Sequence, residues 1–309
     1  MKNSFLCTLL ALVITNPCFA QNRPHQSPHL YAIAQLPTPV LNTSDFPFVF
    51  GNKDGKTLHL DDSGLIREVE FVALPETVFE IEEVISGTAA TIYRVTTEDY
   101  PYPSRNGYFI DSRFVNTVNY KPENRPQKLP PHKVILNNLL SAEGSRYIWG
   151  GNYRAGIPEI LTFYPPHTPL SQNVKDQWIL KGLDCSGLLY EATNGYTPRN
   201  TSSLIAYGET VPIATLNSEQ IIQKLKTLDI LVWKGHVIIV IDRDRTIESR
   251  PDYYTRLNGN QGGVRIRKLR EVLDETLTER VPVNQYSDVV EEGKKKFVVR
   301  RWYKKGDKR

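Results

Sequence analysis

The chain has 309 residues and a formal net charge of +4, with 40% hydrophobic and 23% charged residues. This composition is ordinary for a globular protein and suggests about two domains. The charge suits contact with an anionic surface but is far from that of a nucleic-acid-binding tail, so we expect no nucleic-acid partner.

Residues 1–20 have the pattern of a secretory signal peptide. Lys2 supplies the positive start, the apolar run FLCTLLALVI follows, and CFA ends in a small residue before Gln21. A membrane anchor is the alternative, but the apolar run is short for a spanning helix. We therefore expect an exported protein, periplasmic or secreted, without membrane contact after removal of the signal.

The next hundred residues contain no pattern that points to catalysis. Residues 21–61 are predicted to be an extended N-terminal segment. Residues 62–119 hold short β-branched and aromatic runs between Gly, Pro and Asn, which predicts a small all-β barrel or sandwich. Residues 120–133 contain four prolines and are predicted to be a stiff linker. Residues 134–309 then read as a second domain of mixed helices and strands.

One cysteine of this second domain stands at a predicted helix start. In GLDCSGLLYEATNG, Asp184 is a good N-cap, and Asn194-Gly195 is a stop signal. Cys185 therefore falls in the first turn, where the helix dipole and free amides favour a thiolate. The other two cysteines lie in the predicted signal peptide, so Cys185 has no disulfide partner and forms no structural zinc site. A buried, inert cysteine is the alternative interpretation.

A thiol nucleophile needs a base, and His236 is the best candidate. It is the one histidine of the sequence that begins a regular apolar run, HVIIVI. The following DRDR reads as a hairpin turn, which would bring Glu248 back near His236 as the group that orients the imidazole. An exposed histidine and a solvent-facing glutamate are the alternatives. The amide of Cys185 and the hydroxyl of Tyr147 are candidate oxyanion donors.

The segments YIWGG, DCSGLL and DILVWKGHVIIV together resemble the NlpC-type peptidases of bacterial cell walls. The resemblance covers about residues 134–303, and the spacing of twelve from His236 to Glu248 matches the family's interval between base and third polar residue. Family members usually have histidine at that third place, so Glu248 is a departure. The segment 151–183 is a second departure, because it is longer than the corresponding family loop. Residues 62–119 resemble, more weakly, a bacterial SH3-like barrel.

The resemblance implies an α+β fold, with a papain-like catalytic domain preceded by the small barrel. It also implies an endopeptidase that cleaves the γ-D-glutamyl–diamino acid bond of peptidoglycan stem peptides with a free N-terminal L-alanine. Asp184, Ser186 and Trp149 would bind the alanine–glutamate part together with Tyr147. Trp149 as a core residue is the alternative, and Asp111 is a guess for a second carboxylate near the substrate amine.

No metal or organic cofactor is implied, and the expected partners are stem peptides or muropeptides. An amidase or acyltransferase with the same cysteine and histidine is a second hypothesis. A wall-binding protein with a vestigial catalytic domain is a third. The sequence does not distinguish intact wall from released peptides, and it does not indicate the diamino acid, the oligomeric state or the biological role.

Overall fold

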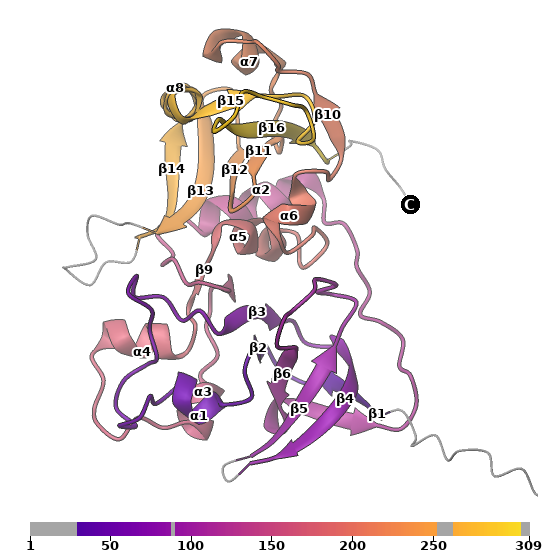
Figure 1. Ribbon diagram of the computed structural model, residues 1–309, viewed down its shortest axis with the longest axis vertical. Coiled ribbons are helices and arrows are strands. Elements are labelled where there is room, and N and C mark those ends of the chain that lie inside the picture. The colour runs from indigo at the N-terminus through magenta and orange to yellow at the C-terminus, as the bar shows by residue number, and fades with distance from the viewer. Residues whose placement is uncertain (1–29, 88–89, 252–261, 304–309) are drawn as a thin grey trace, which may run out of the picture.

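The computed structural model describes residues 30–87, 90–251 and 262–303, so the predicted signal peptide lies outside it. These residues form a mixed helix-and-strand structure with two lobes (Figure 1). The N-terminal lobe comprises residues 30–87, 90–119 and 154–181, and the C-terminal lobe comprises residues 132–151, 182–251 and 262–303. Within the described ranges, no helix is long and apolar enough to cross a membrane.

The N-terminal lobe is built on one antiparallel sheet of seven strands. Its strands are β1 (Leu30–Ala34), β2 (Thr38–Leu41), β3 (Val69–Ala73), β4 (Val78–Ser86), β5 (Thr91–Thr96), β6 (Tyr108–Asp111) and β7 (Val115–Val118). Their order is β3-β2-β6-β5-β4-β1-β7. Among the described strands β3 and β7 end the sheet without pairing to each other, so the predicted closed barrel is not seen there. The short 3-10 helix η1 (Ser112–Phe114) joins β6 to β7.

The prediction of an extended segment over residues 21–61 is wrong for the described residues 30–61, which contain two paired strands and a helix. Strand β1 pairs with β4 and β7, and β2 pairs with β3 and β6. Helix α1 (Phe46–Val49) follows, capped by the side chain of Asp45. These strands have only four or five residues each, and prolines lie close to them in the sequence. They are therefore too short for the alternation of apolar and polar residues to be recognised. Long-range pairing makes them strands.

The segment 151–183 belongs mainly to the N-terminal lobe. Strand β8 (Asn152–Tyr153) pairs with β9 (Gly182–Leu183), and between them the chain forms α3 (Glu159–Phe163) and α4 (Gln172–Trp178). In Figure 1 these helices lie beside α1, far from the large sheet of the other lobe. Trp178 and Leu180 are fully buried in the core of the N-terminal sheet. The insertion therefore completes the N-terminal core.

The C-terminal lobe has a second sheet between two layers of helices. Its strands are β10 (Glu209–Val211), β11 (Ile230–Trp233), β12 (His236–Val240), β13 (Arg245–Pro251), β14 (Gly262–Lys268), β15 (Arg280–Pro282) and β16 (Lys295–Arg301). The order is β10-β16-β11-β12-β13-β14, with β15 parallel to β16. The helices are α2 (His132–Ser141), α5 (Cys185–Ala192), α6 (Thr201–Leu204), α7 (Ser218–Lys224) and α8 (Leu269–Glu279).

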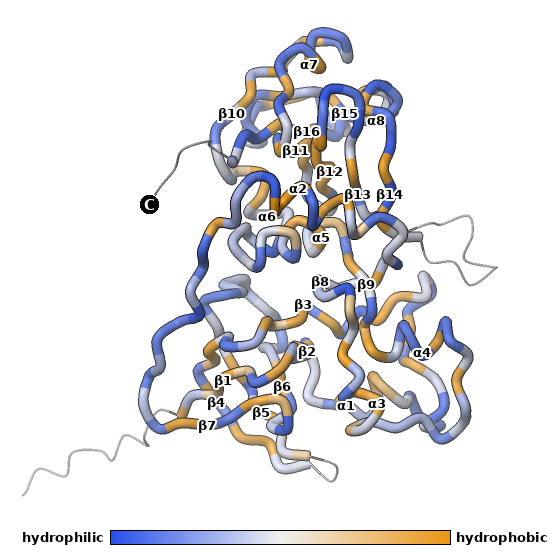
Figure 2. Tube along the Cα trace, turned by 180° about the vertical axis from the view of Figure 1, so that it is seen from behind, coloured by the Kyte–Doolittle hydropathy of each residue, from blue (hydrophilic) through white to orange (hydrophobic). Residues whose placement is uncertain are grey.

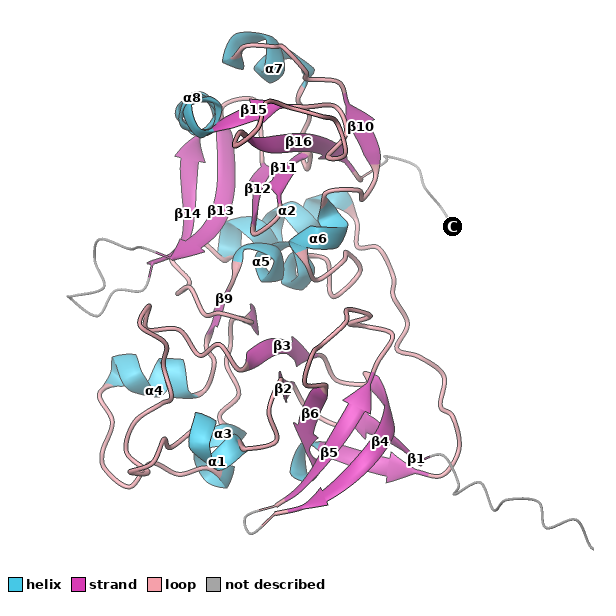
Figure 3. Ribbon diagram, viewed as in Figure 1, coloured by secondary structure: helices cyan, strands magenta, loops and turns pink. Residues whose placement is uncertain are grey.

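The central strands β11 and β12 consist largely of apolar residues, as their orange colour in Figure 2 shows. Val232 and Val237 face the core beneath α2 and α5, whereas Leu231 and Ile238 face the core beneath α7 and α8. Figure 3 shows these two helical layers on either side of the sheet. Strands buried on both faces are rigid supports, and β12 begins with His236.

Candidate active site

Cys185 is the first residue of α5, as the sequence predicts. Asp184 caps the helix, and its Oδ1 accepts a hydrogen bond from the amide of Gly187 at 2.7 Å. Helix α5 packs against β12 and β13, which fixes the level of its first turn. Cys185 is 8% exposed and lines a cavity of about 360 Å³. The thiol is therefore held at the wall of a cleft and is not sealed in the core.

His236 and Glu248 form a hydrogen-bonded pair across neighbouring strands. The register Ile239↔Ile247 between β12 and β13 makes the two side chains diagonal neighbours. Nε2 of His236 lies 2.7 Å from Oε2 of Glu248, whose side chain is 1% exposed. The Cys185 thiol lines the same cavity as His236, and its Sγ lies 3.8 Å from the carbonyl oxygen of Gly235, the residue before His236. Because Nε2 is bonded to Glu248, Nδ1 is the imidazole nitrogen that remains for proton exchange with the thiol.

The ionisation of the pair follows from its contacts. Burial acts against the charged form of His236, but the interactions with Cys185 and Glu248 outweigh it and raise the pKa of His236 to about 9. Burial acts to raise the pKa of Glu248, but the hydrogen bond from His236 and the charges of Arg250 and Arg267 lower it to about 2. The favoured state at neutral pH is an imidazolium beside a carboxylate.

Glu248 is also fixed from its other side. Arg267 on β14 places Nη1 at 3.3 Å from Oε1 of Glu248 and pairs with Glu275 of α8. The next residue of β13, Ser249, points to the opposite face and donates a hydrogen bond to the carbonyl of Leu183 at 2.7 Å. The carboxylate that orients His236 is thus held by two strands and a helix. Sequence reasoning missed Arg267.

The two proposed oxyanion donors lie at the same cleft. The amide of Cys185 is at a helix N-terminus, where backbone N–H groups have no partner in the preceding turn. Tyr147 is 5% exposed and lines the cavity with Cys185 and His236. Trp149 lines the cavity too and is 37% exposed, so it is not a core residue.

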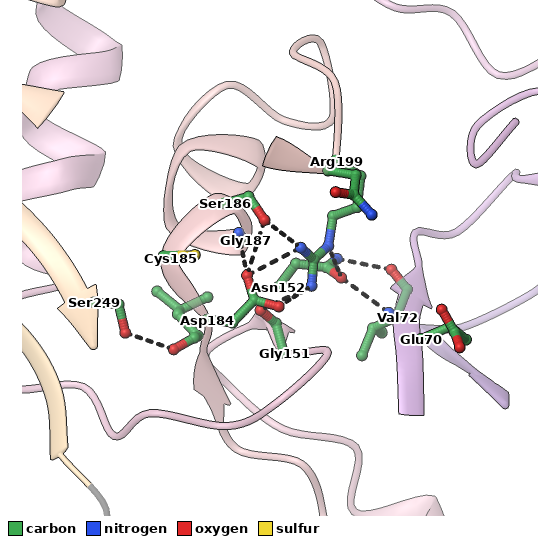
Figure 4. Close-up of polar contacts among 12 residues, drawn as sticks. Glu70, Val72, Gly151, Asn152, Asp184, Cys185, Ser186, Gly187, Arg199 and Ser249 are labelled. Carbon is green, nitrogen blue, oxygen red and sulfur yellow. Dashed lines mark hydrogen bonds and ion pairs between the residues drawn. The ribbon is translucent and has the colours of Figure 1, made fainter. Parts of the chain in front are cut away.

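Asp184 and Ser186 do not line the cavity, and their side chains take part in a buried polar network around Arg199 (Figure 4). Arg199 binds both carboxylate oxygens of Asp184, with Nη1–Oδ1 at 3.0 Å and Nη2–Oδ2 at 2.5 Å. It also donates to Oγ of Ser186 at 2.9 Å. Although burial acts against its charge, Asp184 raises the pKa of Arg199. The carboxylate expected to bind a substrate ammonium is therefore already neutralised by the protein's own guanidinium.

The same network joins the catalytic helix to the N-terminal lobe. Asn152 accepts a hydrogen bond from the amide of Val72 at 2.9 Å and donates one to its carbonyl at 2.7 Å. Arg199 Nε donates to the same Asn152 oxygen at 3.0 Å. A chain of buried contacts thus runs from strand β3 to the N-cap of α5. Sequence reasoning missed both Arg199 and Asn152, because nothing local in the sequence marks either residue as a partner of Asp184.

Asp111, the guessed second acid, lies far from this role. Its side chain is fully buried in the N-terminal lobe, binds Arg113 at 2.6 Å and accepts a hydrogen bond from the hydroxyl of Tyr164 at 2.5 Å. It does not line the cavity of Cys185. Asp111 thus ties the insertion to β6, and the expectation that it lies near the substrate amine was wrong.

In the described part of the chain, no group of three or more His, Cys, Asp or Glu residues could hold a metal ion.

Comparison with known proteins gives a distant likeness among solved structures. No protein-family model matches the chain, and no curated protein matches it either. Among solved structures it is similar to an NlpC/P60 family protein from Bacillus cereus, with 15% sequence identity and a TM-score of 0.32. The alignment covers 89% of this chain and 64% of that one, so this chain spans less than two thirds of its neighbour's length.

Proposed function

We propose that this chain is an exported cysteine peptidase that hydrolyses peptidoglycan stem peptides. The observation that carries the proposal is the placement of Cys185, His236 and Glu248 at one cleft. The thiol stands at a helix start, the imidazole lines the same cavity, and the buried carboxylate lies 2.7 Å from the imidazole. Nucleophile, base and orienting group in this order are what amide hydrolysis by a thiol requires.

The reaction follows from these positions. The Cys185 thiolate attacks the carbonyl carbon, and the oxyanion that forms is bound by the Cys185 amide and Tyr147. His236 gives its proton to the leaving amine, the C–N bond breaks, and a thioester remains. Water then attacks the thioester while His236 takes its proton, and the C–S bond breaks to release the acid and the thiolate. Glu248 stabilises the imidazolium in both halves.

The specific bond is the finer part of the proposal and is supported by the sequence motifs. They indicate the γ-D-glutamyl–diamino acid bond, with Trp149 beside the glutamyl residue. A requirement for a free N-terminal L-alanine was expected to depend on Asp184. Because Asp184 is paired with Arg199, its carboxylate is not free to bind the ammonium group of such a substrate.

The test is hydrolysis of defined L-Ala-γ-D-Glu-diamino acid tripeptides, with products identified by mass spectrometry. We expect cleavage after the glutamyl residue, abolished in Cys185→Ala and His236→Ala. His59→Ala is a matched control, because His59 also lies 2.7 Å from a glutamate, Glu68, but in the N-terminal lobe. It should keep wild-type turnover.

The same assay separates the alternatives. A product joined to an added amine would indicate an acyltransferase, and release of ammonia from an amide would indicate an amidase. Absence of any product, with iodoacetamide labelling of Cys185 no faster than that of a free thiol, would indicate a wall-binding protein with a vestigial site. Acetylated peptides in parallel would show directly whether a free amine matters.

A further inference from the structure

An arginine stacked on a tryptophan stands beside His236 at the wall of the cleft. The guanidinium carbon of Arg280, the first residue of β15, lies 4.3 Å from the ring centroid of Trp233. The Trp233 ring is in turn 5.2 Å from the imidazole of His236. All three residues line the cavity that contains Cys185. The stack therefore holds the planar guanidinium of Arg280 on the Trp233 ring, which itself adjoins the proposed base His236.

The other arginines of this cavity already have carboxylate partners. Arg67 is 2.6 Å from Asp61, although it too lies over a tryptophan, Trp149, at 4.0 Å. Arg267 pairs with Glu275 and with Glu248. Arg250 has a weaker partner, since its Nη1 is 4.0 Å from Oε1 of Glu248.

Arg280 differs from them. In the described part of the chain, no salt bridge within 4.0 Å joins its guanidinium to a carboxylate, although the charge of its chain neighbour Glu279, which lines the same cavity, acts on it. Its side chain is half-buried, and this burial lowers the pKa of Arg280. A partly desolvated cation without a counter-ion is unfavourable unless a ligand supplies the anion. A guanidinium fork suits a carboxylate, which it can bind with two parallel hydrogen bonds.

The position of the stack indicates which part of a substrate it meets. His236 must lie beside the leaving nitrogen, because it gives that nitrogen its proton. The Cys185 amide, which binds the oxyanion, lies on the acyl side. Trp233 adjoins His236, so Arg280 faces the residue that leaves as the amine.

We propose, on the basis of the function proposed above, that Arg280 held on Trp233 binds a carboxylate of the residue on the amine side of the scissile bond. The chain then selects stem peptides whose diamino acid carries a free carboxylate. Two sources have the same chemistry: the α-carboxylate of a terminal diamino acid, and the side-chain carboxylate of meso-diaminopimelate. Peptides that lack both are poor substrates.

Three tripeptides test this inference and separate the two sources. All begin L-Ala-γ-D-Glu. They end in L-lysine amide, in L-lysine with a free carboxylate, or in meso-diaminopimelate with its α-carboxyl amidated. A charged hydrogen bond contributes about 1.5–3 kcal/mol, so the better carboxylate peptide should exceed the amide roughly ten- to a hundredfold in kcat/KM, chiefly through KM. Equal kcat/KM for all three peptides would overturn the inference.

Variants locate the effect. In Arg280→Gln the ratio between carboxylate and amide peptides should fall to about one, and Arg280→Lys should retain part of it. Arg67→Gln is the matched control, because Arg67 also lies on a tryptophan but is neutralised by Asp61. It should keep the wild-type ratio. An unchanged ratio in Arg280→Gln would refute the assignment.

A second measurement does not depend on turnover. Free lysine or meso-diaminopimelate should slow the alkylation of Cys185 by iodoacetamide in the wild-type protein more than lysine amide does, and this difference should vanish in Arg280→Gln. If no tripeptide is cleaved but this difference is present, the proposed peptidase function fails and the carboxylate site stands. If cleavage occurs without any carboxylate dependence in either measurement, the site fails and the peptidase stands.

Discussion

Replacing Arg199 by methionine should destabilise the protein and disturb the catalytic helix together. Arg199 is 4% and Asp184 8% exposed, so the variant leaves a carboxylate buried without its partner. Removing one member of a buried ion pair costs about 3–5 kcal/mol. For a protein of this size each kcal/mol lowers the melting temperature by about 2–4 °C, so we expect a fall of about 6–20 °C.

The assay combines thermal unfolding with the rate of Cys185 alkylation. Arg125→Met is the matched control, because Arg125 is also buried, binds Asp99 at 3.1 Å and contacts the carbonyls of Asn194 and Gly195 at the far end of α5. Both variants should lose stability, but only Arg199→Met should change the alkylation rate at a temperature where both remain folded.

A double variant decides whether the unpaired charge is the cause. Arg199→Met with Asp184→Asn removes the buried charge, so it should be more stable than the sum of the single effects predicts, by about 1–3 kcal/mol. Strict additivity, or an Arg199→Met variant that melts within about 2 °C of the wild type, would refute the reasoning.

The remaining predictions concern the three catalytic residues. Cys185→Ala should abolish hydrolysis with an unchanged circular dichroism spectrum; an unfolded or active variant would contradict the nucleophile assignment. Glu248→Gln keeps a hydrogen bond but not the charge, so kcat should fall roughly ten- to a thousandfold. Activity within about twofold of wild type would refute that role. The pKa of His236 is raised from 6.5 to about 9 and that of Glu248 is lowered from 4.5 to about 2. The stability from this pair is therefore full between pH 4.5 and 6.5, and is lost as pH rises through 9 or falls through 2. Melting temperatures of wild type and Glu248→Gln should converge at both extremes, and a difference independent of pH would contradict the ion pair.

The local features of the site could be predicted from the sequence because each has a local signal. Asp184 and Gly195 mark the two ends of α5, and the structure places the helix between them at Cys185–Ala192. The apolar run after His236 marks β12, and the turn that follows brings Glu248 back beside it. Periodicity, helix capping and turn chemistry depend on residues within a short stretch of chain. They can therefore be recognised in the sequence without knowledge of any tertiary contact.

The rest depends on contacts between distant parts of the chain. Asp184 is a good cap in the sequence, but its second partner, Arg199, becomes visible only when the two meet in the fold. Asn152 pairs with Val72, eighty residues away. The strands of residues 30–41 were missed for the same reason, since their partners lie in β3, β4, β6 and β7.

The insertion between β8 and β9 makes the two lobes inseparable. The chain leaves the N-terminal lobe through residues 120–131, enters the other with α2, returns to bury Trp178 and Leu180, and crosses again to reach Cys185. A fragment beginning at residue 134 would keep the nucleophile but expose that tryptophan, and a fragment ending at residue 133 would lack part of its own core. Cutting the proline-rich linker would therefore release neither half. The position of the nucleophile is coupled to the folding of a sheet that contributes no catalytic group. Substitutions in the N-terminal core can therefore alter catalysis although they contact no residue of the active site.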